Sequence, residues 1–206
     1  MTYSPPLIPP PIFRLASTTT SPTTTFSSPT VATPATSSLS DLYTSSLLHL
    51  GDFTTIESWA RLSNHLSSVP PSCLSKGGNY HLFKKGIKPV FEDPANEKGG
   101  KWVLTLRSHT AATLDSAWRE TILLLVGEAL EPEEGAEEEG EEICGAVVSV
   151  RAKSDRIQLW TRSKEPVERI NAIGKRFVKA LGLEDSSRAL EEGSFGLEFQ
   201  VSSPSH

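Results

Sequence analysis

The amino-acid sequence predicts an α+β fold in which an antiparallel β-sheet carries three α-helices on one face. Two observations indicate this fold. Segments in which apolar and polar residues alternate, as in half-buried strands, are interleaved with segments whose apolar residues recur every three or four positions, as in amphipathic helices. In addition, most strand-like segments are expected to connect through hairpins, which favours antiparallel pairing. We therefore expect one layer of strands backed by one layer of helices.

The first 40 residues differ in composition from the rest of the chain. Ser, Thr and Pro dominate residues 1–40, and such a composition buries too little apolar surface to offset the entropy of ordering. The sequence therefore predicts a disordered tail over residues 1–40 and a folded domain over residues 41–206. Within the tail, only IFRLA at residues 12–16 could pair, as a short edge strand.

Six further segments have the pattern of strands. Most of them show alternating apolar positions, and the fourth is also rich in β-branched residues. A short Ser-Asp turn between the fourth and fifth segments predicts a hairpin. The second segment contains Gly86 in its interior. The six predicted strands are residues 46–53, 79–90, 101–107, 143–153, 156–162 and 195–201.

Three segments have the spacing of amphipathic helices. The first begins with Thr55 as N-cap and Ser58 three positions later, which is typical of a helix start. In the second, Gly127 weakens only the end, and in the third Pro166 lies in the first turn, where proline is tolerated. The predicted helices are residues 54–68 with Ile56, Trp59, Leu62 and Leu66 on one face, residues 114–130 with Leu114, Trp118, Ile122 and Leu125, and residues 164–183 with Val167, Ile170, Ile173, Phe177 and Leu181.

The charge of the chain restricts the partners that it can attract. The 206 residues carry a net charge of −5 at pH 7, so the field of the whole protein repels a polyanion. Any nucleic-acid partner must therefore be held at a local basic site. Residues 131–142, EPEEGAEEEGEE, are expected to form a solvated acidic loop.

Cysteine usage and apolar runs indicate the compartment. Cys73 and Cys144 have neither CxxC spacing nor a nearby His pair, which argues against a disulfide framework and a zinc module and fits a reducing environment. The longest apolar run, residues 121–130, is far shorter than the roughly 20 residues that span a bilayer. No signal peptide is evident at the N-terminus. We expect a cytoplasmic protein without membrane attachment.

One aromatic–carboxylate pair and one basic hairpin indicate a binding chemistry. A solvent-facing Phe91 would stack on a nucleobase, contributing about 1–3 kcal/mol per base, and a positive charge on that base would add cation–π attraction. The adjacent Glu92 can accept both N1–H and N2–H of guanine, which adenine does not offer. Arg151, Lys153 and Arg156 on the predicted hairpin can hold phosphates. Together these residues predict a site for a charged guanine nucleotide such as a methylated mRNA cap.

Each of these features has a simpler interpretation when it is taken alone. Phe91 would then be a core aromatic, the Glu92–Asp93 pair a turn, and the three cations of the hairpin a solvated strand face. Spacing alone therefore leaves both interpretations open.

Longer motifs carry a resemblance. YHLFKKGIKPVFEDPANEKGGKWVLTL, SAWRETILLLVGEAL and EEICGAVVSVRAKSDRIQLWTR resemble the cap-binding translation initiation factor 4E family. HLFKKGIKP and EEICGAVVSVR resemble its second class, the 4E-homologous proteins. The resemblance runs from about residue 43 to residue 183. In that family a curved antiparallel sheet is backed by three helices, and the cap lies between two aromatics on the concave face, so the resemblance implies this fold and this ligand.

The resemblance also implies a role for individual residues. Tyr43 falls at the family's first stacking position and Phe91 at the second, where the family has Trp. Glu92 matches the Glu that reads guanine. The remaining matches are Arg151 and Arg156 to the residues that hold the phosphates, with Lys153 between them, Trp160 to the Trp that contacts the N7-methyl group, and Trp102 and Trp118 to structural Trp residues.

Two departures from the family affect the cap site. Because Phe has a weaker quadrupole than Trp, Phe91 implies a cap affinity below that of a member with two Trp residues. The family's aromatic-rich first strand is not recognisable upstream of Tyr43, and residues 12–16 are the one candidate for it. We therefore expect a degenerate first strand or an incomplete sheet edge.

A third departure concerns the face that receives partner proteins. On the first helix, where Ile56 belongs to this face, the family's partner-contacting Trp falls on Ala60. A family Leu of the second helix falls on Arg119. Because an amphipathic partner helix needs an apolar groove, we expect impaired binding of a 4E-binding scaffold or repressor protein.

The expected function is binding of capped mRNA through 7-methylguanosine triphosphate, in translation initiation or its repression, by a monomer without cofactor or metal. The alternative is a degenerate interaction module with weak or no cap binding. An enzyme is not expected, because His49, His65, His81, His109 and Cys73 have neither nucleophile-elbow nor metal-ligand spacing.

Overall fold

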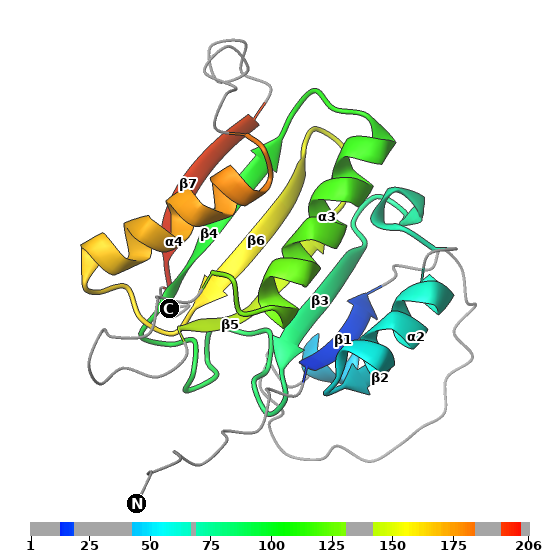
Figure 1. The fold of residues 1–206 in the computed structure, drawn as a ribbon, viewed down its shortest axis with the longest axis horizontal. Helices are drawn as coiled ribbons and strands as arrows, with labels where there is room; N and C mark the ends of the chain where they lie inside the picture. The colour runs from blue at the N-terminus through cyan, green and yellow to red at the C-terminus, as the bar shows by residue number, and fades with distance from the viewer. Residues whose placement is uncertain (1–12, 19–42, 67–68, 131–141, 184–194, 203–206) are drawn as a thin grey trace, which may run out of the picture.

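The computed structural model describes residues 13–18, 43–66, 69–130, 142–183 and 195–202. These residues form a seven-stranded antiparallel sheet with the order β2-β1-β3-β5-β6-β4-β7. Figure 1 shows the sheet as one curved layer with helices on one side of it. The strands are β1 Phe13–Thr18, β2 Leu48–Phe53, β3 Asn79–Lys84, β4 Gly100–Leu106, β5 Ile143–Ser149, β6 Asp155–Thr161 and β7 Phe195–Val201.

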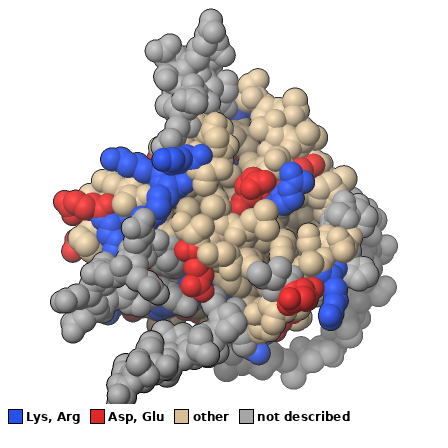
Figure 2. Space-filling model, in the orientation of Figure 1, with Lys and Arg blue, Asp and Glu red and all other residues tan. Residues whose placement is uncertain are grey.

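Three helices cover one face of this sheet, as the sequence predicts. They are α2 Ile56–Leu66, α3 Ala111–Val126 and α4 Val167–Ala180. In Figure 1, α2 lies near β1 and β2, α3 crosses the middle of the sheet and α4 lies near β4 and β7. A short 3-10 helix, η1 Pro71–Cys73, precedes β3. Figure 2 shows this helix-bearing face, where Lys and Arg gather over α4 while most of the remaining surface is uncharged.

Local chemistry explains where the helices begin. The Thr55 hydroxyl accepts a hydrogen bond from the amide of Ser58 at 3.2 Å, and the Ser58 hydroxyl accepts one from the amide of Thr55 at 3.0 Å. This reciprocal pair satisfies two amides that have no partner inside the helix, and it confirms Thr55 as the N-cap. Thr110 caps α3 through a single bond of this kind, in which its hydroxyl accepts from the amide of Thr113. Pro166 was predicted in the first turn of the third helix, and it is instead the N-cap of α4, one position before the observed first turn.

The apolar faces of the sheet and the helices meet in one core. The core includes buried side chains from every helix and from the central strands, and among them Leu104, Ile157, Leu159, Ile173 and Phe177 are fully buried. At about 25 cal/mol per Å² of apolar surface, this burial is the main stabilising contribution to the fold. Trp102 and Trp118 belong to this layer, as the resemblance implies, and the Trp102 indole donates to the carbonyl of Ile170 at 3.0 Å.

Three local predictions are wrong. Residues 13–18 form a strand, but β1 is not at an edge: it pairs with β2 on one side and β3 on the other. The expected incomplete edge is therefore absent from the described sheet. Gly86 was predicted inside a strand, but it lies in the turn that follows β3. Its φ of 92° is a turn conformation that glycine adopts readily. Finally, hairpins do not dominate: four of the six strand pairings in the described sheet join strands that are not consecutive.

The domain boundary also changes. Phe13 and Leu15 of β1 are 2% exposed, and the Phe13 ring stacks on Phe53 with 5.6 Å between centroids. Since these side chains supply core, the folded domain begins upstream of residue 41. The other residues of the predicted tail, apart from β1, and nearly all of the acidic loop lie outside the described residues.

Candidate functional site

The face of the sheet opposite the helices carries three parallel rows of side chains, here called the open face. Alternation along each strand and the register between strands fix these rows. The rows run across β3, β5, β6 and β4 in that order. They are Phe83–Gly145–Trp160–Lys101, His81–Val147–Gln158–Val103 and Asn79–Ser149–Arg156–Thr105.

The loop between β3 and β4 brings Phe91 over the first row, and two buried polar residues hold its shape. Asp93 accepts hydrogen bonds from the amides of Lys88 at 2.8 Å and Ala95 at 2.9 Å. The Asn96 side-chain amide donates to the carbonyls of Lys88 and Val90, both at 2.8 Å. Because these bonds satisfy backbone groups within the loop, they fix its conformation. Asp93 is thus structural, whereas the neighbouring Glu92 is exposed.

The sequence predicted a solvent-facing Phe91, but the Phe91 side chain is half-buried. Its ring packs on Trp160 with 4.6 Å between centroids and 31° between planes. Trp160 itself is 5% exposed, and its indole nitrogen has no hydrogen-bond partner among the described residues. The Lys101 ammonium lies 4.7 Å from the Phe91 centroid and 5.1 Å from that of Trp160. This geometry is a cation–π contact with two rings.

Lys101 is a further candidate site residue, which the sequence patterns did not predict. It sits opposite Trp160 in the register between β4 and β6. Burial lowers the pKa of its ammonium, and the positive charge of Arg156 lowers this pKa further. The strand alternation of residues 101–107 predicts the face on which Lys101 lies, but only the pairing of β4 with β6 brings it to Trp160.

Tyr43 stands over the second row. Its hydroxyl lies 3.3 Å from Nε2 of His81, and the two rings meet edge to face with 6.1 Å between centroids. Tyr43 is 37% exposed, so part of this residue is accessible to a ligand. Burial lowers the pKa of His81 to about 4, and the nearby Arg151 adds to this effect. His81 is therefore a neutral imidazole at pH 7.

The two stacking candidates lie over different strands and different rows of the open face. Tyr43 contacts β3 through His81, and Phe91 contacts β6 through Trp160. One strand, β5, lies between β3 and β6. Because neighbouring strands lie about 4.8 Å apart, β3 and β6 are about 10 Å apart across the sheet, and the His81 row and the Trp160 row are offset by about 7 Å more along the strands.

The predicted cations gather at one end of the open face. Arg156 belongs to the third row, and Lys153 lies in the turn between β5 and β6. The Arg151 guanidinium donates to the Asn79 side chain at 2.8 Å and to the Val150 carbonyl at 2.9 Å. These bonds hold it at the corner of the sheet. All three cations are exposed, so the end of the open face beyond the aromatic rows is positively charged.

The predicted partner face is only partly described. Ala60 on α2 and Arg119 on α3 are both exposed, and Arg119 donates to the Ser116 hydroxyl at 3.3 Å. The third predicted residue of this face, Ile56, begins α2, and its side chain lies outside the described part of the structure. A cavity of about 320 Å³ opens between α2, α3 and η1, with Trp59, Tyr80 and Trp118 among its lining residues and Arg119 beside them.

The described residues offer neither a metal cluster nor a membrane span. Among the residues with a described placement, no group of three His, Cys, Asp or Glu side chains could hold a metal ion. No helix in the described ranges is both long and apolar enough to cross a bilayer.

Comparison of the chain with known proteins gives consistent matches. A family model described as eukaryotic initiation factor 4E matches residues 23–202. The chain is 39% identical to eukaryotic translation initiation factor 4E-1B of Danio rerio over 145 residues, which are 70% of this chain and 64% of that protein. It is 40% identical to eukaryotic translation initiation factor 4E1 of Drosophila melanogaster over 131 residues, 64% of this chain and 47% of that protein. The matched region thus spans about half to two thirds of these relatives.

Solved structures match over nearly the whole chain. Ascaris suum eIF4E-3 in complex with m7G cap has a TM-score of 0.69 and 29% identity, covering 96% of this chain and 94% of that one. Caenorhabditis elegans eIF4E-3 in complex with the 4E-binding protein Mextli has a TM-score of 0.69 and 28% identity, covering 93% and 90%. These values extend the similarity from the sequence to the three-dimensional fold.

Proposed function

The chain belongs to the eukaryotic initiation factor 4E family, and from this premise we propose that its open face binds the 7-methylguanosine cap of mRNA. The observation that carries the proposal is the placement of two partly exposed aromatics on the open face, Tyr43 over the His81 row and Phe91 over the Trp160 row, on strands about 10 Å apart across the sheet. A solved relative, eIF4E-3 of Ascaris suum, is described in complex with m7G cap.

The proposed recognition uses the positive charge of the methylated base. A 7-methylguanine ring between Tyr43 and Phe91 gains stacking on both faces and cation–π attraction. The exposed carboxylate of Glu92, next to Phe91, accepts the N1–H and N2–H donors of guanine, a charge-assisted pair of bonds. Trp160, which packs against Phe91, borders the N7-methyl group. Unmethylated guanine has no fixed charge, so it binds less tightly.

The phosphates of the cap point toward the positive end of the open face. Arg156 and Arg151 hold them, with Lys153 at the turn. Lys101 joins this set, because its ammonium lies beside the Phe91 and Trp160 rings and near enough to Arg156 for that charge to lower the pKa of Lys101. A local cluster of four cations offsets the repulsion that a net charge of −5 exerts on RNA.

In this proposal the protein is a non-enzymatic cytoplasmic factor that acts in translation initiation or its repression. A solved relative, eIF4E-3 of Caenorhabditis elegans, is in complex with the 4E-binding protein Mextli, so we propose a partner of this kind for α2 and α3. Ala60 offers no large apolar surface and Arg119 places a charge at this face, so the usual amphipathic helix binds weakly there.

One observation favours the second candidate, a 4E-like module with weak cap binding. Phe91 rests on Trp160 and faces the Lys101 ammonium. A cationic ligand must compete with this ammonium for the ring, which lowers its affinity.

Retention on immobilised 7-methylguanosine triphosphate at moderate salt tests the proposal. We expect retention of the wild type, elution by free 7-methylguanosine triphosphate and poor elution by GTP. Phe91→Ala and Glu92→Ala should abolish retention, whereas Glu97→Ala, at an exposed carboxylate of the same loop, should not. Failure of the folded wild type to bind would refute cap binding and favour the second candidate.

A further inference from the structure

A second cavity lies at the positive end of the sheet, beyond the proposed cap site. Its volume is about 340 Å³, within the range typical of small-ligand pockets. The loop from β4 to α3, the first turn of α3, the turn from β5 to β6 and Ser72 of η1 form its walls, and the two connections lie at the same end of the sheet in Figure 1. The polar residues that line it include Ser72, Arg107, His109, Arg151, Lys153 and Asp155.

The charges on the walls of this cavity favour an anion. Arg107, Arg151 and Lys153 contribute three positive charges, and all three are exposed. The carboxylate on the wall, Asp155, already has partners at both oxygens: Oδ1 accepts from the Arg151 amide at 2.8 Å, and Oδ2 lies 2.9 Å from Nε2 of His109. Asp155 therefore ties the two connections together, and the cavity keeps an excess of positive charge.

The cavity lies at the strand ends next to the third row of the proposed cap site, and Ala111 and Leu114 extend it toward the helix-bearing face. Successive rows of the open face lie about 7 Å apart along the strands. The order is the Trp160 row, the His81 row and the Arg156 row, and then the cavity just past the strand ends. Arg151 belongs to both sites: its guanidinium bonds Asn79 of the third row, and it lines the cavity. A chain that leaves the cap phosphates over the third row thus reaches the cavity next.

We propose that this cavity binds phosphodiester groups of the single-stranded RNA that follows the cap, with Arg107 as a contact outside the cap site itself. The proposal rests on the proposed function. Backbone contacts of this kind carry no sequence information and strengthen binding of any capped RNA. Because the net charge of −5 repels RNA from the rest of the protein surface, a local basic cavity sets the direction in which the RNA strand leaves the cap site.

The test compares two ligands on matched variants. The ligands are 7-methylguanosine triphosphate and a capped oligoribonucleotide of about eight nucleotides, within the site sizes of single-strand binders. Arg107→Gln should weaken binding of the capped oligonucleotide about three- to tenfold and leave binding of 7-methylguanosine triphosphate unchanged. The slope of log K against log salt for the oligonucleotide should become shallower by about 0.7, the value for one phosphate contact on a single strand.

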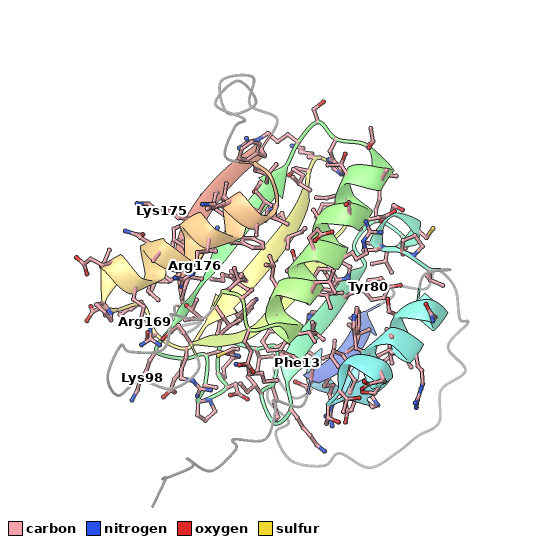
Figure 3. The ribbon with its side chains drawn as sticks, in the orientation of Figure 1. Phe13, Tyr80, Lys98, Arg169, Lys175 and Arg176 are labelled. Carbon is pink, nitrogen blue, oxygen red and sulfur yellow. The ribbon has the colours of Figure 1, made fainter. Side chains whose placement is uncertain are left out.

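Two further variants make the test specific. Arg107→Lys keeps the charge and should retain most of the affinity for the oligonucleotide. Lys175→Gln removes one exposed charge from α4, on the helix-bearing side of the molecule (Figure 3), and should have no effect. An unchanged affinity in Arg107→Gln, or an equal loss in Lys175→Gln, would overturn the proposal.

The uncapped oligonucleotide separates this proposal from the proposed function. If the wild type does not bind 7-methylguanosine triphosphate, the proposed function is refuted. Binding of the uncapped oligonucleotide that depends on Arg107 would then still support an RNA site in the cavity. Absence of such binding would refute both proposals.

Discussion

The Lys101 ammonium lies 4.7 Å from the centroid of the Phe91 ring, so the ring that is proposed to receive a cationic base already faces a cation of the protein itself. The register of β4 against β6, which sets Lys101 opposite Trp160, enforces this relationship. Since Lys101 is half-buried and its pKa is lowered by burial, the ammonium is incompletely hydrated at this position. Its contact with the ring is correspondingly stronger.

Replacing Lys101 by Met should separate competition for the ring from attraction of phosphate. Loss of the resident cation should raise the affinity for the nucleoside 7-methylguanosine about two- to fivefold, the effect of a cation–π contact of about 0.5–1 kcal/mol. The ratio of affinities for 7-methylguanosine triphosphate and the nucleoside should fall, because a positive charge near the phosphates is lost. Tryptophan fluorescence titration measures both constants.

Lys98→Met is the matched control for that experiment. Lys98 is an exposed lysine of the loop that carries Phe91, and its replacement should change neither constant. An equal loss of affinity for nucleoside and triphosphate in Lys101→Met would show that Lys101 supports the ring and does not compete for it.

Tyr43 should contribute through its ring and not through its hydroxyl. Tyr43→Phe removes the 3.3 Å contact with His81 but keeps a stacking surface, so cap affinity should stay near that of the wild type. Tyr43→Ala should cost about 1–3 kcal/mol of binding free energy. Isothermal titration with 7-methylguanosine triphosphate measures both variants, and similar losses in the two would contradict the stacking role.

His81 should make the free energy of unfolding depend on pH. Burial depresses its pKa from 6.5 to about 4 in the folded protein, so between these values the unfolded chain binds a proton that the folded one does not. Protonation of His81 therefore does not reduce the free energy of unfolding above pH 6.5. As the pH drops from 6.5 toward 4, the free energy of unfolding falls, by up to about 3 kcal/mol. Urea unfolding at about pH 7 and about pH 4.5 should show a smaller decrease for His81→Gln than for the wild type. The same decrease in both proteins would exclude His81 as the cause.

Gly174 should be intolerant of any side chain. A Cβ atom there would lie 2.6 Å from Cε2 of Trp102, and this indole is fixed by its bond to Ile170. Gly174→Ala should therefore lower the free energy of unfolding by about 1–3 kcal/mol through overpacking. Asn171→Ala, at an exposed position of the same helix, is the control and should be near neutral. Thermal unfolding followed by circular dichroism compares the two, and an unchanged stability in Gly174→Ala would contradict close packing of α4 on β4.

Local patterns predicted most of the secondary structure and part of the candidate site. The alternation in residues 195–201 predicted β7 with its observed bounds, and the Thr55–Ser58 pair predicted the start of α2. The same patterns failed at Phe91, which was expected to face solvent and instead packs on Trp160. No periodicity in the loop around Phe91 indicates which strand its ring will meet.

The amino-acid sequence by itself determined the identity of the helices and strands, because the spacing of apolar residues within each segment decides which periodic structure can bury one face. It also determined family membership and the residue types of the candidate site. The tertiary structure alone decided the order of the strands, the position of β1 between β2 and β3, and the contacts of Lys101 with Phe91 and Trp160. These features depend on packing between segments far apart in the chain, and local periodicity contains no information about which distant strand becomes a neighbour.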